Sequence, residues 1–269
     1  MRMLLVLGAA LAMIGCTAQS VGAQSARGDR DLAYGSDPRQ KLDIYRPSGA
    51  APAPVIVFFY GGGFSSGDRR PYADLAEPFV RKGFVVVIPD YRLVPQVTYP
   101  AFVEDGAAAV RWTRDHVRDH GGDPARISVL GHSAGAYIAA MVALDPRWLA
   151  KAGAPGAVRA LAGFAGSYGV GPERRGGARG MVSGQPDAEP VSHVSATSPP
   201  AFLAAGDADS MNASTQALGL AKALSDKGVA SEARVYPGLD HFQTLYAVMD
   251  GDGGRVLGDV SAFLLSHSR

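Results

Sequence analysis

Short runs of apolar residues alternate with segments of helical periodicity along most of this chain, and this alternation most restricts its fold. Each run has the length of a strand and is apolar throughout, which is typical of strands buried on both faces. Parallel strands joined by crossover helices produce this pattern, so we predict the α/β class, with a mostly parallel central sheet and helices on both faces. The expected strands are residues 54–60, 84–89, 127–130, 158–164, 200–205 and 233–236, and the expected helices are residues 72–82, 103–120, 134–144, 213–227 and 255–265.

The composition supports one globular domain. The chain has 269 residues, of which 47% are hydrophobic and 19% charged, and α/β folds of this length commonly form a single domain. We place the domain at residues 41–269, with an irregular, cap-like segment at about residues 168–200 that is rich in Gly, Pro, Ser and Arg. Residues 24–40 are polar and are interpreted as a linker. The formal net charge of +1 gives no electrostatic reason to expect binding to nucleic acid.

The first residues have the features of an export leader. A positively charged start precedes an apolar run at residues 4–14, which is shorter than the roughly 20 residues of a membrane-spanning helix. We interpret residues 1–23 as a signal or lipoprotein leader. Cleavage is expected either before Cys16, which lies as in a bacterial lipobox and would be lipidated, or after Ala23 at an ordinary small-x-small site. Both routes predict an exported protein, in the bacterial periplasm or anchored to the membrane through a lipidated Cys16.

The run Gly-His-Ser-Ala-Gly at residues 131–135 has the spacing of a nucleophile elbow, a sharp turn that presents a serine between a strand and a helix. Residues 63–67 match the same spacing, so the motif alone does not select one serine. Ser133 follows an expected strand and precedes an expected helix, whereas Ser65 is followed by Gly, Asp, two Arg and Pro. We therefore predict that Ser133 is the nucleophile.

A serine nucleophile needs a base, and the base needs an acid that orients it. In hydrolases with this elbow, the acid and then the histidine follow the serine, each on a loop after a later strand. Asp207 and Asp209 follow one expected strand and His241 follows the next, so His241 is the predicted base and both aspartates are candidate acids. We expect His132 to pack beside the serine, because it lies inside the elbow itself.

Developing negative charge on a substrate carbonyl oxygen requires backbone N–H donors, together called the oxyanion hole. The amide of Ala134 is one candidate, and the glycine-rich loop at residues 60–63, directly after an expected strand, is the second source. This loop lacks the Gly-Lys-Ser/Thr ending of a phosphate-binding loop. The serine, its partners and these amides supply the chemistry, so no metal and no organic cofactor is implied.

These motifs, in their order, resemble the α/β-hydrolase carboxylesterases of the hormone-sensitive-lipase and feruloyl-esterase-like (BD-FAE) type. In such enzymes the oxyanion donors are the second and third glycines of His-Gly-Gly-Gly, which implies Gly62 and Gly63. The acid ends a Gly-x-x-Asp motif, which implies Asp209, with Asp207 as the alternative. Tyr60 departs from the family, because it replaces the usual histidine. The matching segments are residues 60–64 (Tyr-Gly-Gly-Gly-Phe), 90–95 (Asp-Tyr-Arg-Leu-Val-Pro), 100–105 (Pro-Ala-Phe-Val-Glu-Asp), 121–124 (Gly-Gly-Asp-Pro), 131–136 (Gly-His-Ser-Ala-Gly-Ala) and 236–238 (Tyr-Pro-Gly) with His241.

The resemblance implies a single-domain α/β-hydrolase fold and a carboxylesterase that cleaves small acyl esters through an acyl-enzyme on Ser133. The same groups also serve amide, formamide or peptide hydrolysis, which is the alternative reaction. A third hypothesis is a protein of this fold that binds without catalysis, because fold alone does not determine function.

Overall fold

The central sheet of the molecule has eight strands in the order β1-β2-β4-β3-β5-β6-β7-β8 among the residues described by this computed structural model, which are 27–49, 52–170, 185, 187–249 and 254–268. β1 pairs antiparallel with β2, and β2 antiparallel with β4, while every later pairing is parallel. The strands are β1 (Arg27–Ala33), β2 (Lys41–Arg46), β3 (Ala53–Phe59), β4 (Val85–Pro89), β5 (Gly122–His132), β6 (Val158–Phe164), β7 (Ala201–Gly206) and β8 (Ser231–Tyr236).

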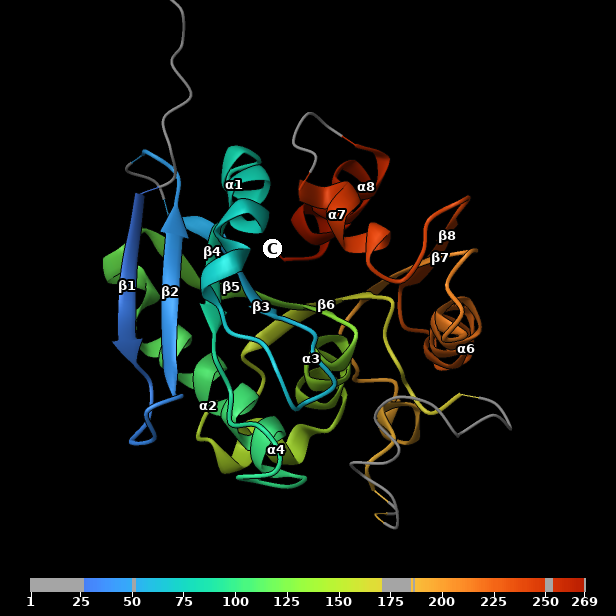
Figure 1. Ribbon diagram of the computed structural model, residues 1–269, viewed down its shortest axis with the longest axis horizontal. Coiled ribbons are helices and arrows are strands. Elements are labelled where there is room, and N and C mark those ends of the chain that lie inside the picture. The colour runs from blue at the N-terminus through green and yellow to red at the C-terminus, as the bar shows by residue number, and fades with distance from the viewer. Residues whose placement is uncertain (1–26, 50–51, 171–184, 186, 250–253, 269) are drawn as a thin grey trace, which may run out of the picture.

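Helices cover both faces of this sheet (Figure 1). α1, α7 and α8 pack together on one face, and α2, α3 and α4 pack together on the other, while α6 contacts β7 and β8. The α-helices are α1 (Ala73–Arg81), α2 (Ala101–His116), α3 (Ala134–Leu144), α4 (Pro146–Lys151), α6 (Ala213–Ser225), α7 (Gln243–Met249) and α8 (Arg255–His267). Short 3-10 helices are η1 (Arg70–Tyr72), η2 (Val117–His120) and η3 (Pro190–His193). The predicted fold class, a mostly parallel sheet with helices on both faces, is confirmed.

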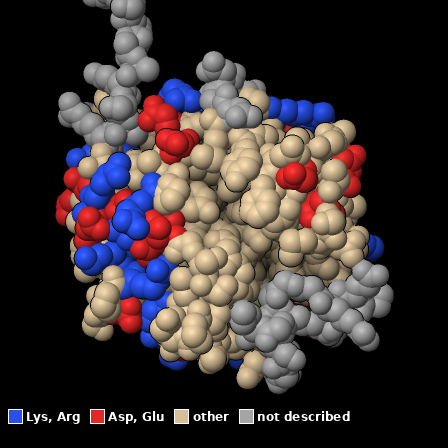
Figure 2. Space-filling model, viewed as in Figure 1, with Lys and Arg blue, Asp and Glu red and all other residues tan. Residues whose placement is uncertain are grey.

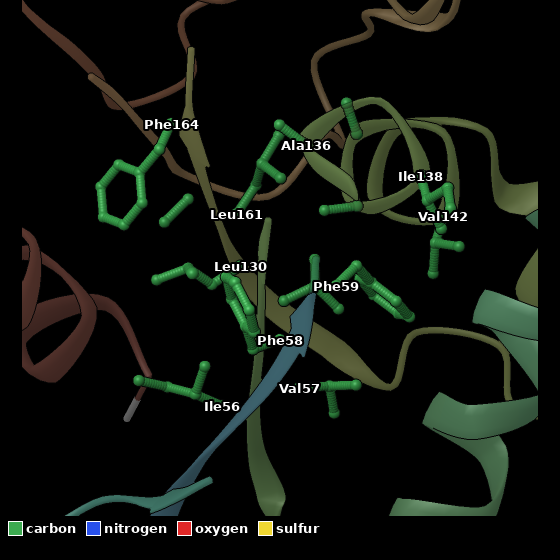
Figure 3. Close-up of a cluster of buried hydrophobic side chains, with 14 of the residues drawn as sticks. Ile56, Val57, Phe58, Phe59, Leu130, Ala136, Ile138, Val142, Leu161 and Phe164 are labelled. Carbon is green, nitrogen blue, oxygen red and sulfur yellow. The ribbon is translucent and has the colours of Figure 1, made fainter. Parts of the chain in front are cut away.

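The core lies on the two faces of the central strands. Every residue of β3 and β4 is buried, which explains why these segments are apolar throughout rather than alternating. Successive side chains on β3 point to opposite faces of the sheet. Phe59 points toward Ile138 and Val142 of α3 (Figure 3). This contact packs α3 against the end of β3.

The interpretation of residues 24–40 as a linker is wrong where β1 forms. β1 lies at the edge of the sheet, and edge strands exposed to water tolerate the polar side chains that suggested a linker. Its backbone pairs with β2, and Asp29 forms a salt bridge of 2.8 Å with Arg46. Tyr34, just after β1, is buried, and its hydroxyl donates to the carbonyl oxygen of Asp90.

Two other sequence-based predictions fall wholly or partly outside the described residues. The leader at residues 1–23, including Cys16, is not described, so its cleavage and lipidation stay predictions. Of the cap-like segment, residues 168–170, 185 and 187–200 are described, and they pack on the domain: Tyr137 donates to the carbonyl oxygen of Ala188 at 2.6 Å. Within the described ranges, no helix is both long enough and apolar enough to cross a membrane.

Candidate active site

Ser133 occupies the sharp turn between β5 and α3. Its backbone angles are φ 54° and ψ −120°, a conformation that non-glycine residues adopt only under strain of about 1–3 kcal/mol. The turn also brings strand and helix into close contact. A Cβ atom at Gly131 would lie 2.2 Å from the carbonyl oxygen of Gly135, and one at Gly135 would lie 2.0 Å from that of Phe59. Both glycines of the motif are therefore required by the geometry of the elbow.

Three side chains that are far apart in the sequence form a continuous hydrogen-bonded chain beside this turn. The hydroxyl of Ser133 lies 2.9 Å from Nε2 of His241, and Nδ1 of His241 lies 2.8 Å from Oδ2 of Asp209. Because a carboxylate only accepts, Nδ1 carries the hydrogen and Nε2 is free to accept from the serine. The side chain of Asp209 is fully buried, while that of His241 is 13% exposed and reaches the cavity.

The two candidate acids have different partners. Asp209 meets His241 and also accepts a hydrogen bond of 2.7 Å from the backbone N–H of Met211. Asp207 is exposed, and its Oδ1 accepts from the backbone N–H of Gly238 at 2.6 Å. Asp207 thus ties together the loops that follow β7 and β8, and only Asp209 is within hydrogen-bond distance of the imidazole.

Backbone N–H groups converge on the cavity from two directions. Ala134 begins α3, and the first N–H groups of a helix have no acceptor within the helix. Gly62 and Gly63 have positive φ angles of 129° and 58°, which suit glycine, and they line the same cavity. Among the described residues, none accepts a hydrogen bond from these three N–H groups. They can therefore serve as donors to a bound oxyanion.

Tyr60 braces the glycine loop. It stands where the α/β-hydrolase carboxylesterases that this sequence resembles usually have a histidine. Its hydroxyl donates to Oδ1 of Asp90 at 2.9 Å and accepts from Arg39 at 2.9 Å, while the hydroxyl of Tyr91 donates to its carbonyl oxygen at 2.8 Å. Arg39 also donates to the carbonyl oxygen of Gly67, at the other end of the loop. Burial and the neighbouring Asp90 raise the pKa of Tyr60 far above its ordinary value, so the hydroxyl stays protonated.

His132 holds the backbone of the predicted base. It is only 2% exposed, and its Nε2 lies 2.9 Å from the carbonyl oxygen of His241, to which it donates. Burial lowers the pKa of His132 from 6.5 to about 4, so the ring is neutral near pH 7. The sequence placed this ring beside the serine, but it carried no signal for the contact with a loop 109 residues away.

The cavity at this site has a volume of about 810 Å³ and is lined by the loops that follow β3, β5, β6, β7 and β8, together with α7. No Lys or Arg is among its described lining residues, and the carboxylate of Asp240 caps α7 by accepting from the N–H groups of Phe242 and Gln243. Figure 2 shows a hollow near the middle of one face surrounded by uncharged residues, whereas charged side chains gather over β1 and β2. The cavity therefore suits an uncharged ligand.

The α7 wall of the cavity was missed by sequence reasoning. Its apolar side chains recur at residues 242, 245, 246 and 249, which is helical spacing, but the helix has only seven residues and follows a turn. None of the described residues of the cap-like segment lines the cavity. The described residues also contain no group of three or more His, Cys, Asp or Glu side chains that could hold a metal ion.

The sequence of this chain matches the models of two protein families. The model of the prolyl oligopeptidase family matches residues 101–268, and the BD-FAE model matches residues 42–149. Two Mycobacterium tuberculosis proteins are similar in sequence. Esterase LipQ is 32% identical over 75% of this chain and 53% of its own length, and the probable carboxylic ester hydrolase LipM is 31% identical over 82% and 57%. The chain thus spans about half the length of the curated relatives it matches.

Solved structures share the whole fold. A truncated carbohydrate esterase from gut microbiota superposes with a TM-score of 0.79 and covers 92% of this chain and 98% of its own. Its sequence is 19% identical, so this similarity supports the fold alone. Esterase 2 of Thermogutta terrifontis, phosphoramylated by tabun, superposes with a TM-score of 0.73 at 26% identity, covering 91% and 95%.

Proposed function

We propose that this chain, which belongs to the prolyl oligopeptidase family and has an α/β-hydrolase fold, is a carboxylesterase that cleaves small acyl esters with Ser133 as nucleophile. One observation carries the proposal: a serine on a strained turn is hydrogen-bonded to a histidine, which is bonded to a buried carboxylate. The serine and the histidine open onto a cavity with free N–H donors. Similarity to proteins named as esterases supports ester bonds as the target.

The first half of the reaction transfers the acyl group to the enzyme. Oγ of Ser133 forms a bond to the ester carbonyl carbon while its proton moves to Nε2 of His241. Asp209 stabilises the resulting imidazolium and keeps Nδ1–H in place. The carbonyl oxygen gains negative charge and accepts hydrogen bonds from the oxyanion N–H groups. The bond to the alkoxide oxygen then breaks, and His241 returns the proton to this oxygen, which releases the alcohol.

The second half frees the acid. Water attacks the acyl carbon of the ester on Ser133, and His241 accepts one proton of that water. The bond to Oγ breaks, the proton returns from His241 to Oγ, and the carboxylic acid leaves. The donors in this step are the N–H groups of Gly62, Gly63 and Ala134, which serve both tetrahedral intermediates. Rigid positioning of the glycine loop by Tyr60 supports both halves of the reaction.

Amide or peptide cleavage is a second candidate, because the prolyl oligopeptidase model matches the part of the chain that holds Ser133, Asp209 and His241. Both reactions form the same acyl-enzyme and differ only in the leaving group. A direct comparison uses p-nitrophenyl acetate, p-nitrophenyl butyrate and the matching acyl p-nitroanilides. We expect ester turnover to exceed anilide turnover, and faster anilide hydrolysis would favour the second candidate.

The test of the nucleophile uses the purified chain beside Ser133→Ala. The substitution should lower the turnover number on the order of a million-fold, as loss of the serine does in such triads. A fluorophosphonate probe should label the wild type at Ser133 and leave the variant unlabelled. Labelling at Ser65, the serine of the other Gly-x-Ser-x-Gly run, would refute the assignment. Equal inertness of wild type and variant towards every ester and anilide would favour binding without catalysis.

A further inference from the structure

Large apolar side chains on the surface of the described part of the chain gather at the mouth of the cavity. Four such side chains are more than half exposed: Met211, Leu218, Phe242 and Tyr246. All except Leu218 line the cavity. Leaving apolar area in water is unfavourable, and exposed apolar groups concentrated around a cavity are typical of a binding surface. Something apolar is therefore expected to cover them.

Phe242 and Tyr246 form an aromatic wall that begins at the predicted base. The ring of Phe242 lies 5.3 Å from that of His241, edge to face, and 6.4 Å from that of Tyr246, with an angle of 22° between the two phenyl planes. The two residues are one helical turn apart at the start of α7. Both residues are more than half exposed, so a flat group can pack against their exposed surface.

The other aromatic side chains among the described lining residues of the cavity are less exposed. Phe64 and Tyr137 also line the cavity, but both are at least 98% buried. The ring of Phe64 stacks on that of Phe102 at 4.4 Å and meets that of Tyr137 at 5.5 Å. Tyr72 also lines the cavity, but it is partly buried, and its ring stacks on that of Tyr60 at 5.5 Å. The most exposed aromatic side chains at the cavity are therefore Phe242 and Tyr246.

The chemistry of the proposed reaction says which part of the substrate lies on that side. His241 returns its proton to the leaving oxygen, so the alcohol part must pass beside its imidazole. The carbonyl oxygen points instead toward the N–H groups of Gly62, Gly63 and Ala134. The alcohol part therefore extends along the wall of Phe242 and Tyr246.

We propose that Phe242 and Tyr246 form a subsite for the alcohol part of the substrate, and that this subsite selects an uncharged aromatic alcohol. The proposal rests on the proposed ester hydrolysis. The lack of Lys and Arg among the described lining residues disfavours an anionic alcohol part, and the carboxylate of Asp240 is already bonded to two N–H groups. Two nearly parallel ring faces match a planar group better than a puckered one, since aromatic rings stack face to face with an offset.

The experiment compares benzyl acetate with cyclohexylmethyl acetate, whose alcohol parts have similar size but differ in planarity. Both esters form the same acetyl-enzyme, so the ratio of their kcat/KM values reports binding and acylation and is independent of deacylation. We expect the wild type to prefer the benzyl ester. Phe242→Ala should lower the kcat/KM ratio of benzyl to cyclohexylmethyl ester about tenfold, the loss of one aromatic contact together with its buried area, and Phe242→Tyr should preserve the ratio. Any intrinsic difference between the two leaving groups cancels when variant and wild type are compared.

Leu218→Ala is the matched control, because it removes an equally exposed apolar side chain from α6, away from the cavity, and should leave the ratio unchanged. Methyl phenylacetate and methyl acetate share one alcohol and differ on the acyl side, so the ratio of their kcat/KM values should be the same in wild type and Phe242→Ala. A ratio unaffected by Phe242→Ala, or a loss confined to methyl phenylacetate, would overturn the subsite while leaving ester hydrolysis in place. Failure of the wild type to hydrolyse either acetate would instead count against the proposed function.

Discussion

Acidification should destabilise this protein through His132, and the substitution His132→Gln should remove most of that effect. In the folded protein this histidine is buried, and burial lowers its pKa from 6.5 to about 4. The hydrogen bond to the carbonyl oxygen of His241 partly opposes this lowering of the pKa. The charge of the His241 ring lowers the pKa by a smaller amount, and the charge of Asp209 raises it. In the unfolded chain the imidazole is in water and titrates near 6.5. Between these two values the unfolded state binds a proton that the folded state does not.

The sign and size of the pH effect on the free energy of unfolding follow from this difference in bound protons. The free energy of unfolding falls as the pH falls through a range where the unfolded state binds more protons. For His132 the contribution is complete above about pH 6.5 and decreases toward pH 4. One pKa unit corresponds to about 1.4 kcal/mol, so the loss approaches about 3 kcal/mol at pH 4. That is a large part of the roughly 5–15 kcal/mol by which domains are stable.

The assay is urea unfolding of the wild type and His132→Gln, followed by fluorescence of Trp112 and Trp148 at several pH values between 4 and 8. Glutamine still offers an N–H group to the carbonyl oxygen of His241 but does not titrate in this range. The variant should lose less free energy of unfolding than the wild type on acidification, with the slopes differing by up to about 1.4 kcal/mol per pH unit. His116→Gln, at an exposed position of α2, is the control and should follow the wild type. Parallel curves for the wild type and His132→Gln would refute the reasoning.

Three further substitutions, two of them paired with a control substitution, test the site and the elbow. Asp209→Asn should lower kcat about 10⁴-fold, because the imidazole loses the carboxylate that holds it. Asp207→Asn is the control and should lower kcat less than about tenfold. Similar losses of kcat in the two variants would contradict the assignment of Asp209 as the acid. Tyr60→Phe should lower the free energy of unfolding by about 1–3 kcal/mol, seen in urea, because the hydroxyl bridges two polar partners; an unchanged midpoint would contradict the bracing role. Gly135→Ala should lower the free energy of unfolding by about 3 kcal/mol or more, because its Cβ would meet a backbone oxygen. Gly258→Ala, where the added Cβ has open space around it, is the control and should leave the free energy of unfolding unchanged or raise it.

The sequence predicted the parts of the fold whose signals are local. Strands buried on both faces are apolar throughout, so β3, β4, β6 and β7 were expected within one or two residues of their observed bounds. β1 was missed, because an edge strand in contact with water has no apolar pattern. α7 was missed because seven residues are too few to establish a period beside a turn-forming loop. β2 and α4 were also not among the expected elements. All four are short elements that are stabilised by tertiary contacts rather than by their own pattern.

For the site, the sequence by itself determined that Ser133 lies on a strand–turn–helix elbow, and that an aspartate and His241 follow later strands. Those features depend on the order of the chain and on glycines that let backbone segments meet. The resemblance implied Asp209 as the acid and left Asp207 as the alternative. The tertiary structure shows that Asp209 contacts the imidazole, whereas Asp207 points toward the backbone of Gly238. It also decided that Tyr60 and His132 brace the surrounding loops. Their partners are distant in sequence, so hydrogen bonds between them arise only after folding has closed those loops.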